Sequence, residues 1–378
     1  KTAYESSLGL VGSEMCIRDS SSVVPRPGAE YFLTIQAKTN RNLPLIQKKH
    51  VVAWEQFKLP IGRPSISQDP NELPVIHIAE TDSNVSVIGE RFQVFFNKKT
   101  GYLSDYIFNN RQIIKSDLIP HFWRAPLDND LGNKMHIRTA SWKNVDKELT
   151  LKYFQRSLSN NVAKVKVITE HKTTGSRITM IYRIYGNGLI DIQQQLKTGN
   201  KRLPELPRFG MKMTLPKDFN RLTWFGRGPH ESYWDRKTSA AVKVYSGSVW
   251  DQTYPYVRPQ ETGNKTDVRW MALDNGTIGL LAIGQPIFDG SVHQYPYSDL
   301  DYVPAGRLHG KLDLKPKNQV DWLIDYRQTG VGGDNSWGAR PHLKYTLAGK
   351  STSYEYHFYL RPFVKDDDLM TLSKLKIK

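Results

Sequence analysis

The chain has 378 residues and a mass of 43.4 kDa, with 53 Lys and Arg against 37 Asp and Glu, so its formal net charge is +16. This length suffices for two or three domains with a substantial core. The mean hydropathy is −0.53, and no apolar run approaches the ~18 residues of a membrane span. A lone cysteine, Cys16, excludes an internal disulfide and a cysteine metal cluster.

The basic excess raises nucleic acid as a partner, because neutralising phosphates supplies most non-specific affinity. Basic pairs such as Lys48-Lys49, Lys98-Lys99 and Lys201-Arg202 are, however, scattered among acidic residues. That scatter is typical of a solvated surface. We therefore expect neither nucleic acid nor a membrane as a partner.

Residues 1–20 differ from the rest of the chain, since they show neither alternation nor a helical stripe and hold the cysteine. The run LVGSEMCIRDS resembles translated sequencing-adapter sequence, so we expect 1–20 to be a non-native, disordered segment that packs against nothing. No signal peptide is recognisable, and the chain starts at Lys1. We expect the native start to be missing, which leaves the compartment open between cytoplasm and periplasm.

From residue 31 the sequence alternates with period two. Tyr31, Leu33 and Ile35 alternate with their neighbours, and residues 51–57 do so again, which predicts two strands. The proline-rich stretch 63–78 predicts a linker.

Beyond this linker, strand follows strand. Residues 92–96 and 102–107 flank the turn 97–101, as in a hairpin. Further alternating segments lie at 165–169, 178–184, 190–192, 278–283, 320–324 and 354–360. No segment of a dozen residues shows a period of 3.6. Strands separated by turn signals at ~8–12-residue spacing predict an all-β fold.

The first of three unusual segments is 121–133, HFWRAPLDNDLGN. Its simplest interpretation is a structural loop in which Arg124 pairs with Asp128 or Asp130. A calcium loop is an alternative for the Asp-Asn-Asp run, but too few oxygen ligands are correctly spaced. We therefore expect no metal site in it.

The second segment is 224–236, WFGRGPHESYWDR, where an aromatic strand enters a turn and a charged loop. His230 and Glu231 could serve as general acid and base. Adjacent residues of an extended chain point to opposite sides, so structural pairing is the better interpretation. The sequence contains no HExxH zinc motif, nucleophile elbow or phosphate-binding loop.

The third segment is 330–338, GVGGDNSWG, a glycine-rich loop around Trp337. A Trp held out on such a loop can lie flat against a sugar, and removing ~50–100 Å² of apolar surface from water would contribute roughly 1–2.5 kcal/mol. The alternative is a Trp folded back onto its own domain as a plug.

Taken together and in this order, these segments resemble the C-terminal part of the glycoside hydrolase family 2 β-galactosidases. The matching stretches span about 30–365 and are VVAWEQFKLP at 51–60, FWRAPLDNDLG at 122–132, WFGRGPHESYWDR at 224–236, YVRPQETGNKTDVRW at 256–270 and GVGGDNSW at 330–337. The resemblance implies an immunoglobulin-like remnant at 21–62, a large antiparallel β-supersandwich of galactose mutarotase type at 79–366, and a tail at 367–378.

Members of the family that this chain resembles are retaining enzymes. They cleave terminal non-reducing β-D-galactose, and both of their catalytic glutamates lie in a TIM barrel. Here the barrel signatures are absent, and the nearest Asn-Glu pair, Asn71-Glu72, lies in the predicted linker. The resemblance therefore implies no catalytic residue in this chain and no activity for it alone. It also implies no cofactor here, because the family's Mg, Na or Ca is bound mainly by the barrel.

By the same resemblance, Trp337 is a platform for the sugar at the active-site mouth, chiefly on the aglycone side. Gly132, followed by Asn133 and Lys134, matches a loop that opens and closes beside the active site, where glycine permits backbone states that other residues resist. The implied partners are the missing barrel and N-terminal domains and a β-galactoside substrate, with a homo-oligomer of the intact enzyme as a further possibility.

Two other functions stay open. Aldose mutarotases share the supersandwich fold and use a His and a Glu across a sugar; His293, His309 and Glu261 are available, although no mutarotase sequence pattern is evident. The chain could also be a free-standing carbohydrate-binding module. A module should be covered on all sides, whereas a severed domain should expose a large apolar patch.

Overall fold

The computed structural model describes residues 24–199, 202–304 and 313–377. The segment expected to be non-native, 1–20, and one mutarotase candidate, His309, lie outside these residues. The described residues divide into two units, one formed by 24–68 with 370–377 and the other by 69–369.

The smaller unit is built on a two-stranded antiparallel sheet. β1 (Tyr31–Lys38) pairs with β2 (Val51–Leu59), which confirms the two strands predicted from the period-two alternation. β3 (Ser67–Gln68) and β21 (Lys376–Ile377) pair in parallel, so two stretches from opposite ends of the chain meet in this unit.

The larger unit consists mainly of antiparallel strands, which confirms the all-β class. Among the described residues, twelve strands form one sheet and five form a second. The twelve are β9 (Ser116–His121), β10 (Thr150–Ser159), β11 (Val162–His171), β12 (Ser176–Tyr185), β13 (Ile190–Lys197), β14 (Arg208–Pro216), β15 (Arg221–Gly228), β16 (Ala241–Ser248), β17 (Lys265–Asp274), β18 (Ile278–His293), β19 (Gln319–Gln328) and β20 (Ser353–Val364). The five are β4 (His77–Glu80), β5 (Asn84–Ile88), β6 (Phe92–Asn97), β7 (Leu103–Phe108) and β8 (Arg111–Gln112).

The described helices are all short. They are α2 (Asp128–Gly132), α3 (Met135–Arg138), α4 (Val145–Glu148) and α5 (Leu369–Leu372), with 3₁₀ turns η1 (Pro70–Glu72), η2 (Ala140–Trp142), η3 (Trp250–Gln252), η4 (Tyr297–Leu300) and η6 (Leu343–Tyr345). None of these helices has the length and apolar character needed to cross a membrane.

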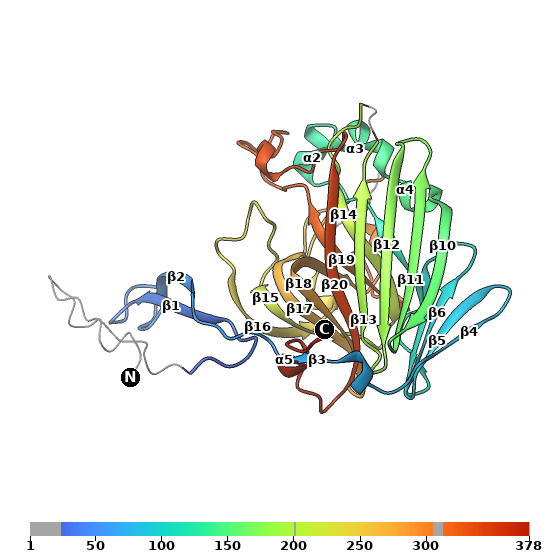
Figure 1. The fold of residues 1–378 in the computed structure, drawn as a ribbon. Coiled ribbons are helices and arrows are strands. Elements are labelled where there is room, and N and C mark those ends of the chain that lie inside the picture. The colour runs from blue at the N-terminus through green and yellow to red at the C-terminus, as the bar shows by residue number, and fades with distance from the viewer. Residues whose placement is uncertain (1–23, 200–201, 305–312, 378) are drawn as a thin grey trace. The chain divides into compact units, whose positions relative to one another are not determined.

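The large sheet changes layer at β18. This strand pairs with β20 as far as Gly284 and with β19 from Asp289 onward. β19 then pairs with β14, and β14 with β9. The sheet therefore curls, so that β14 and β19 lie behind the row β10–β13 and β20 in Figure 1.

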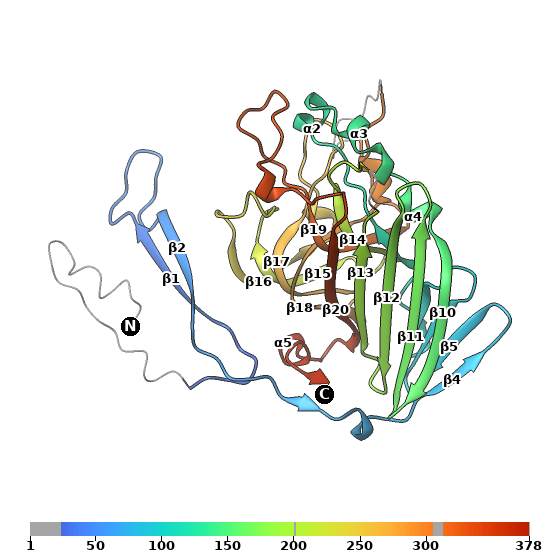
Figure 2. The same cartoon turned by 45° about the horizontal axis from the view of Figure 1, so that its top comes forward.

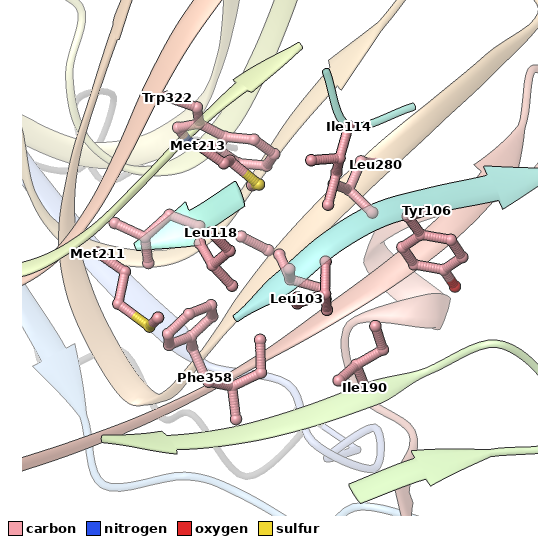
Figure 3. Packing of buried hydrophobic residues seen from close by; sticks show 14 of the residues in the cluster. Leu103, Tyr106, Ile114, Leu118, Ile190, Met211, Met213, Leu280, Trp322 and Phe358 are labelled. Carbon is pink, nitrogen blue, oxygen red and sulfur yellow. The ribbon is translucent and has the colours of Figure 1, made fainter. Parts of the chain in front are cut away.

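The hydrophobic core fills the space inside the curl. Figure 3 shows Leu103 of β7, Leu118 of β9, Met213 of β14, Trp322 of β19 and Phe358 of β20 converging, and each is fully buried. Because successive side chains alternate between the two faces of a strand, every second residue of these strands reaches the core. This burial is the physical origin of the period-two pattern in the sequence.

We expect Leu103→Ala to lower the free energy of unfolding by about 2–5 kcal/mol, because it removes buried methyl groups and leaves a cavity. The matched control is Leu158→Ala in β10, where the side chain is 43% exposed, and it should cost less than about 1 kcal/mol. Urea unfolding of the whole chain measures both. Equal losses would contradict a core centred on Leu103.

Candidate functional site

The three unusual segments of the sequence meet at one end of the larger unit. α2 and α3 lie at the same end of the sheet as the orange-red loop that follows β19 (Figures 1 and 2). We call residues 330–339 of this loop the Trp337 loop. The 224–236 segment reaches it through Asp235, whose carboxylate accepts the N–H of Gly332 at 2.7 Å.

Arg124 anchors the base of the Trp337 loop. Its fully buried guanidinium donates to the carbonyls of Thr329 and Gly330, the second at 3.0 Å, and pairs with the carboxylate of Asp130. The sequence left open whether Arg124 pairs with Asp128 or with Asp130, and in the structure it pairs with Asp130. Asp128 instead accepts from Arg258 at the surface.

The side chains of the Asp-Asn-Asp run at 128–130 turn to three separate partners. Asp128 turns to Arg258, Asp130 turns to Arg124, and the amide of Asn129 contacts the backbone of Gly338 and Ala339. In the part of the chain that the structure describes, no group of three or more His, Cys, Asp or Glu side chains could hold a metal ion.

Trp337 projects from its loop, and its side chain is 85% exposed. The turn around it is held by Asn335, whose Oδ1 accepts the N–H of Trp337 at 2.9 Å and that of Ala339 at 3.3 Å. The indole therefore does not fold back onto its own domain as a plug.

Gly132 ends α2 in direct contact with the Trp337 loop. A Cβ at Gly132 would lie 2.9 Å from the Cα of Gly338, and one at Gly338 would lie 2.6 Å from the carbonyl carbon of Gly132. Gly338 has a φ of +112°, whereas Gly132 has no left-handed φ. In this conformation the structure requires glycine at 132 for close approach, and an unusual backbone state of Gly132 in an opening and closing loop stays a prediction.

The two residues after Gly132 turn the chain into α3. The carbonyl and side-chain oxygens of Asn133 accept from Arg138 at 2.8 and 3.1 Å. Lys134 precedes α3 with a φ of +59°, in the left-handed region. The strained position of this segment is therefore Lys134.

A cavity of about 120 Å³ separates α3 from the residues that follow the Trp337 loop. It is lined by Asp130, Met135, Arg138, Thr139, Glu205, Pro207, Thr329, Arg340, Pro341, Leu343 and Thr346.

Glu231 and His230 point apart, in agreement with a structural interpretation. Buried Glu231 accepts from Tyr256, from Arg236 at 2.6 Å and from the N–H of Gly263 at 2.9 Å, whereas exposed His230 contacts Ser239. Burial alone would raise the pKa of Glu231, but these hydrogen bonds hold it below its usual value.

The mutarotase candidates that can be placed, Glu261 and His293, are fully buried. Glu261 accepts from Arg208 at 2.8 Å, from Tyr297 and from Gln328 at 3.3 Å. Burial, together with the charge of Arg208, lowers the pKa of His293 to about 3. Neither side chain can reach a sugar in this conformation.

A buried polar layer surrounds Glu261, and the sequence did not reveal it. Asp325 of β19 lies opposite Asp289 of β18, and both are buried, with Asp325 3.5 Å from Arg208 Nε. Burial raises the pKa of Asp325 to about 8 and that of Asp289 to about 7. The sequence signal that could have revealed this layer is a carboxylate in the middle of an apolar strand, as at Asp289 and Asp325.

Replacing Arg124 by Met should cost about 3–5 kcal/mol of stability, because it leaves Asp130 buried without its cation. Arg258→Met is the matched control: it breaks the Asp128 pair, whose side chains are 46% and 59% exposed. An exposed pair of this kind contributes about 0–1 kcal/mol. Denaturant unfolding of both variants tests the difference, and a loss of similar size in both would contradict the anchoring role.

The raised pKa of Asp325 makes stability depend on pH. The folded state holds this proton more tightly than the unfolded chain, so the stabilisation is fully present below about pH 4 and is lost as the pH rises through about 8. Relative to Asp325→Asn, the natural chain should lose up to about 1.4 kcal/mol per pH unit between pH 5 and 8. The free energy of unfolding of the natural chain and of Asp325→Asn, measured at each pH, tests this. Parallel pH dependences for the two proteins would refute it.

Models of two known protein families match this chain. A family model described as the β-galactosidase small chain matches residues 88–360, and one described as β-galactosidase domain 4 matches residues 13–60. The second match begins inside the segment 1–20.

Relatives of known name extend this similarity. The β-galactosidase of Priestia megaterium is 35% identical over 338 residues, covering 88% of this chain and 32% of that protein. That of Pseudoalteromonas haloplanktis is 28% identical, covering 86% and 32%. The chain thus spans about a third of the length of these relatives. A galactose mutarotase-like protein of Clostridium acetobutylicum overlaps 78% of this chain, with 9% identity and a TM-score of 0.45.

Proposed function

This chain belongs to the β-galactosidase small-chain family, and on that premise we propose that it is the C-terminal part of a β-galactosidase of glycoside hydrolase family 2. The intact enzyme would hydrolyse terminal non-reducing β-D-galactose residues with retention. The observation that carries the proposal is the family match across 88–360, which includes the exposed Trp337 on its anchored loop.

Within this enzyme, we propose that Trp337 forms one aromatic wall of the sugar site. Three features support that role: the indole is 85% exposed, Asn335 holds the turn around it, and Arg124 fixes the base of its loop. A loop whose backbone is already fixed loses little conformational freedom when a sugar ring stacks on its indole, so more of the contact energy appears as affinity.

The catalytic carboxylates would come from the missing barrel. A retaining glycosidase needs two carboxyl groups about 5–5.5 Å apart and free to meet the sugar. Each of these carboxylates around Trp337 already pairs with, or accepts a hydrogen bond from, another residue of this chain: Asp130 from Arg124, Asp128 from Arg258, Asp235 from Gly332, Asp334 from His342 and Glu205 from Arg138. We therefore propose that this chain is inactive alone and that metal ions of the intact enzyme are held by its other domains.

Exposed apolar residues favour a severed domain over a free-standing module. Ile137 of α3, Val257 beside Arg258, Trp337 and Leu343 at the cavity are 65%, 81%, 85% and 88% exposed. All four belong to segments that contact one another around α2 and α3. We propose that the barrel covers this face in the intact enzyme. A homo-oligomer of the intact enzyme is a further proposed assembly.

A chimeric enzyme tests the proposal. Residues 30–366 would replace the matching C-terminal segment of the Priestia megaterium β-galactosidase, to which this chain is 35% identical. We expect the chimera to hydrolyse an aryl β-galactoside and the purified chain alone to show no turnover. Turnover by the chain alone, abolished by mutating one of its own acids, would overturn the proposal.

In the same chimera, Trp337→Ala should raise KM by about 5- to 70-fold, the equivalent of roughly 1–2.5 kcal/mol of lost apolar contact. Trp337→Phe keeps a flat ring and should recover part of that loss. Leu343→Ala is the matched control, because Leu343 is equally exposed but aliphatic. A Trp337→Ala chimera with an unchanged KM would remove Trp337 from the sugar site.

A further inference from the structure

The amide of Asn129 fastens the helical turn α2 to the Trp337 loop. Its Nδ2 donates to the carbonyl of Ala339 at 2.8 Å, and its Oδ1 accepts the N–H of Gly338 at 2.6 Å. One planar side chain therefore satisfies both a donor and an acceptor of the backbone directly after Trp337. The pairing is specific for asparagine, because aspartate would place a second acceptor against the carbonyl of Ala339.

Arg124, paired with Asp130 of α2, holds the start of the Trp337 loop through the carbonyl of Gly330, whereas Asn129 holds its end. Beside Asn129, Gly132 and Gly338 touch backbone to backbone, which holds only while neither carries a Cβ. On the other side, the cavity of about 120 Å³ lies between α3 and residues 340–346. This void removes packing contacts along its lining.

We infer that Asn129 is a positioning residue that makes α2, with Asn133 and Lys134, move together with the Trp337 loop. A shift of the segment would carry the indole with it. Because coupling between two positions is reciprocal, a ligand that holds the indole would equally hold the segment. The identity of that ligand as a galactoside rests on the proposed function, whereas the coupling itself does not.

Residue-resolved hydrogen exchange on the purified chain tests the coupling. In Asn129→Ala we expect exchange to speed up about tenfold at the N–H of Lys134 and of Trp337 together, which bond to Leu131 and Asn335 respectively and not to Asn129. Loss of one local hydrogen bond would speed only the N–H of Gly338. Acceleration confined to Gly338 would overturn the inference.

Asn133→Ala is the matched control. It removes an amide from the same segment, but that amide accepts from Arg138 and does not contact the Trp337 loop. Exchange at Trp337 should then stay as in the natural chain. The unfolding midpoint of each variant shows whether it folds, and the isosteric Asn129→Asp, which keeps the acceptor for Gly338, replaces Asn129→Ala if the latter does not.

A fluorine label separates this inference from the proposed function. With 5-fluorotryptophan, the resonance of Trp337 is the one missing in Trp337→Phe, and it should sharpen in Asn129→Ala because the loop gains motion. If the Trp337 resonance sharpens in Asn129→Ala but does not respond to an aryl β-galactoside in the chimera, the proposed sugar contact of Trp337 is wrong and the coupling through Asn129 is supported. If the linewidth is the same in Asn129→Ala as in the natural chain, the coupling is wrong, irrespective of the response to the galactoside.

Discussion

The buried guanidinium of Arg124 is the interaction on which the site depends. It joins Asp130, in the turn that begins at Asp128, to Thr329, which lies 205 residues after Arg124 in the chain. A buried cation is costly unless it is paired and hydrogen-bonded. Here one carboxylate and two carbonyls meet it. The loop that bears Trp337 therefore starts from a point whose position is set by the sheet.

This anchoring explains how a large aromatic ring can stand in solvent on a glycine-rich loop. Glycine loses more conformational freedom on folding than any other residue, so such a loop would not be expected to hold one shape by itself. Polar contacts at Gly332, Gly338 and Ala339, made by Asp235 and Asn129, take the place of apolar packing. The ring is left free because the backbone beneath it is held.

Much of the fold could be predicted from the sequence because its signal is local. Strands such as 92–97 and 176–185 show their period-two burial in consecutive residues. The four- and five-residue helices α2–α4 could not be predicted, since one turn is too short to display a period of 3.6. The change of layer at β18 was not predicted either, since the apolar pattern indicated a strand only at 278–283. Gln285 and Pro286 interrupt that apolar run at the point where the partner strand changes.

The sequence by itself determined the family resemblance and those strands whose alternation is clear over consecutive residues, because both depend on residue types at short spacing. The tertiary structure alone decided that Arg124 takes Asp130 and leaves Asp128 to Arg258. It also decided that Gly132 is needed to meet Gly338, and that Asn129 reaches the loop of Trp337. These pairings join residues up to 210 positions apart, and the curl of the sheet, which no local pattern encodes, is what brings them together.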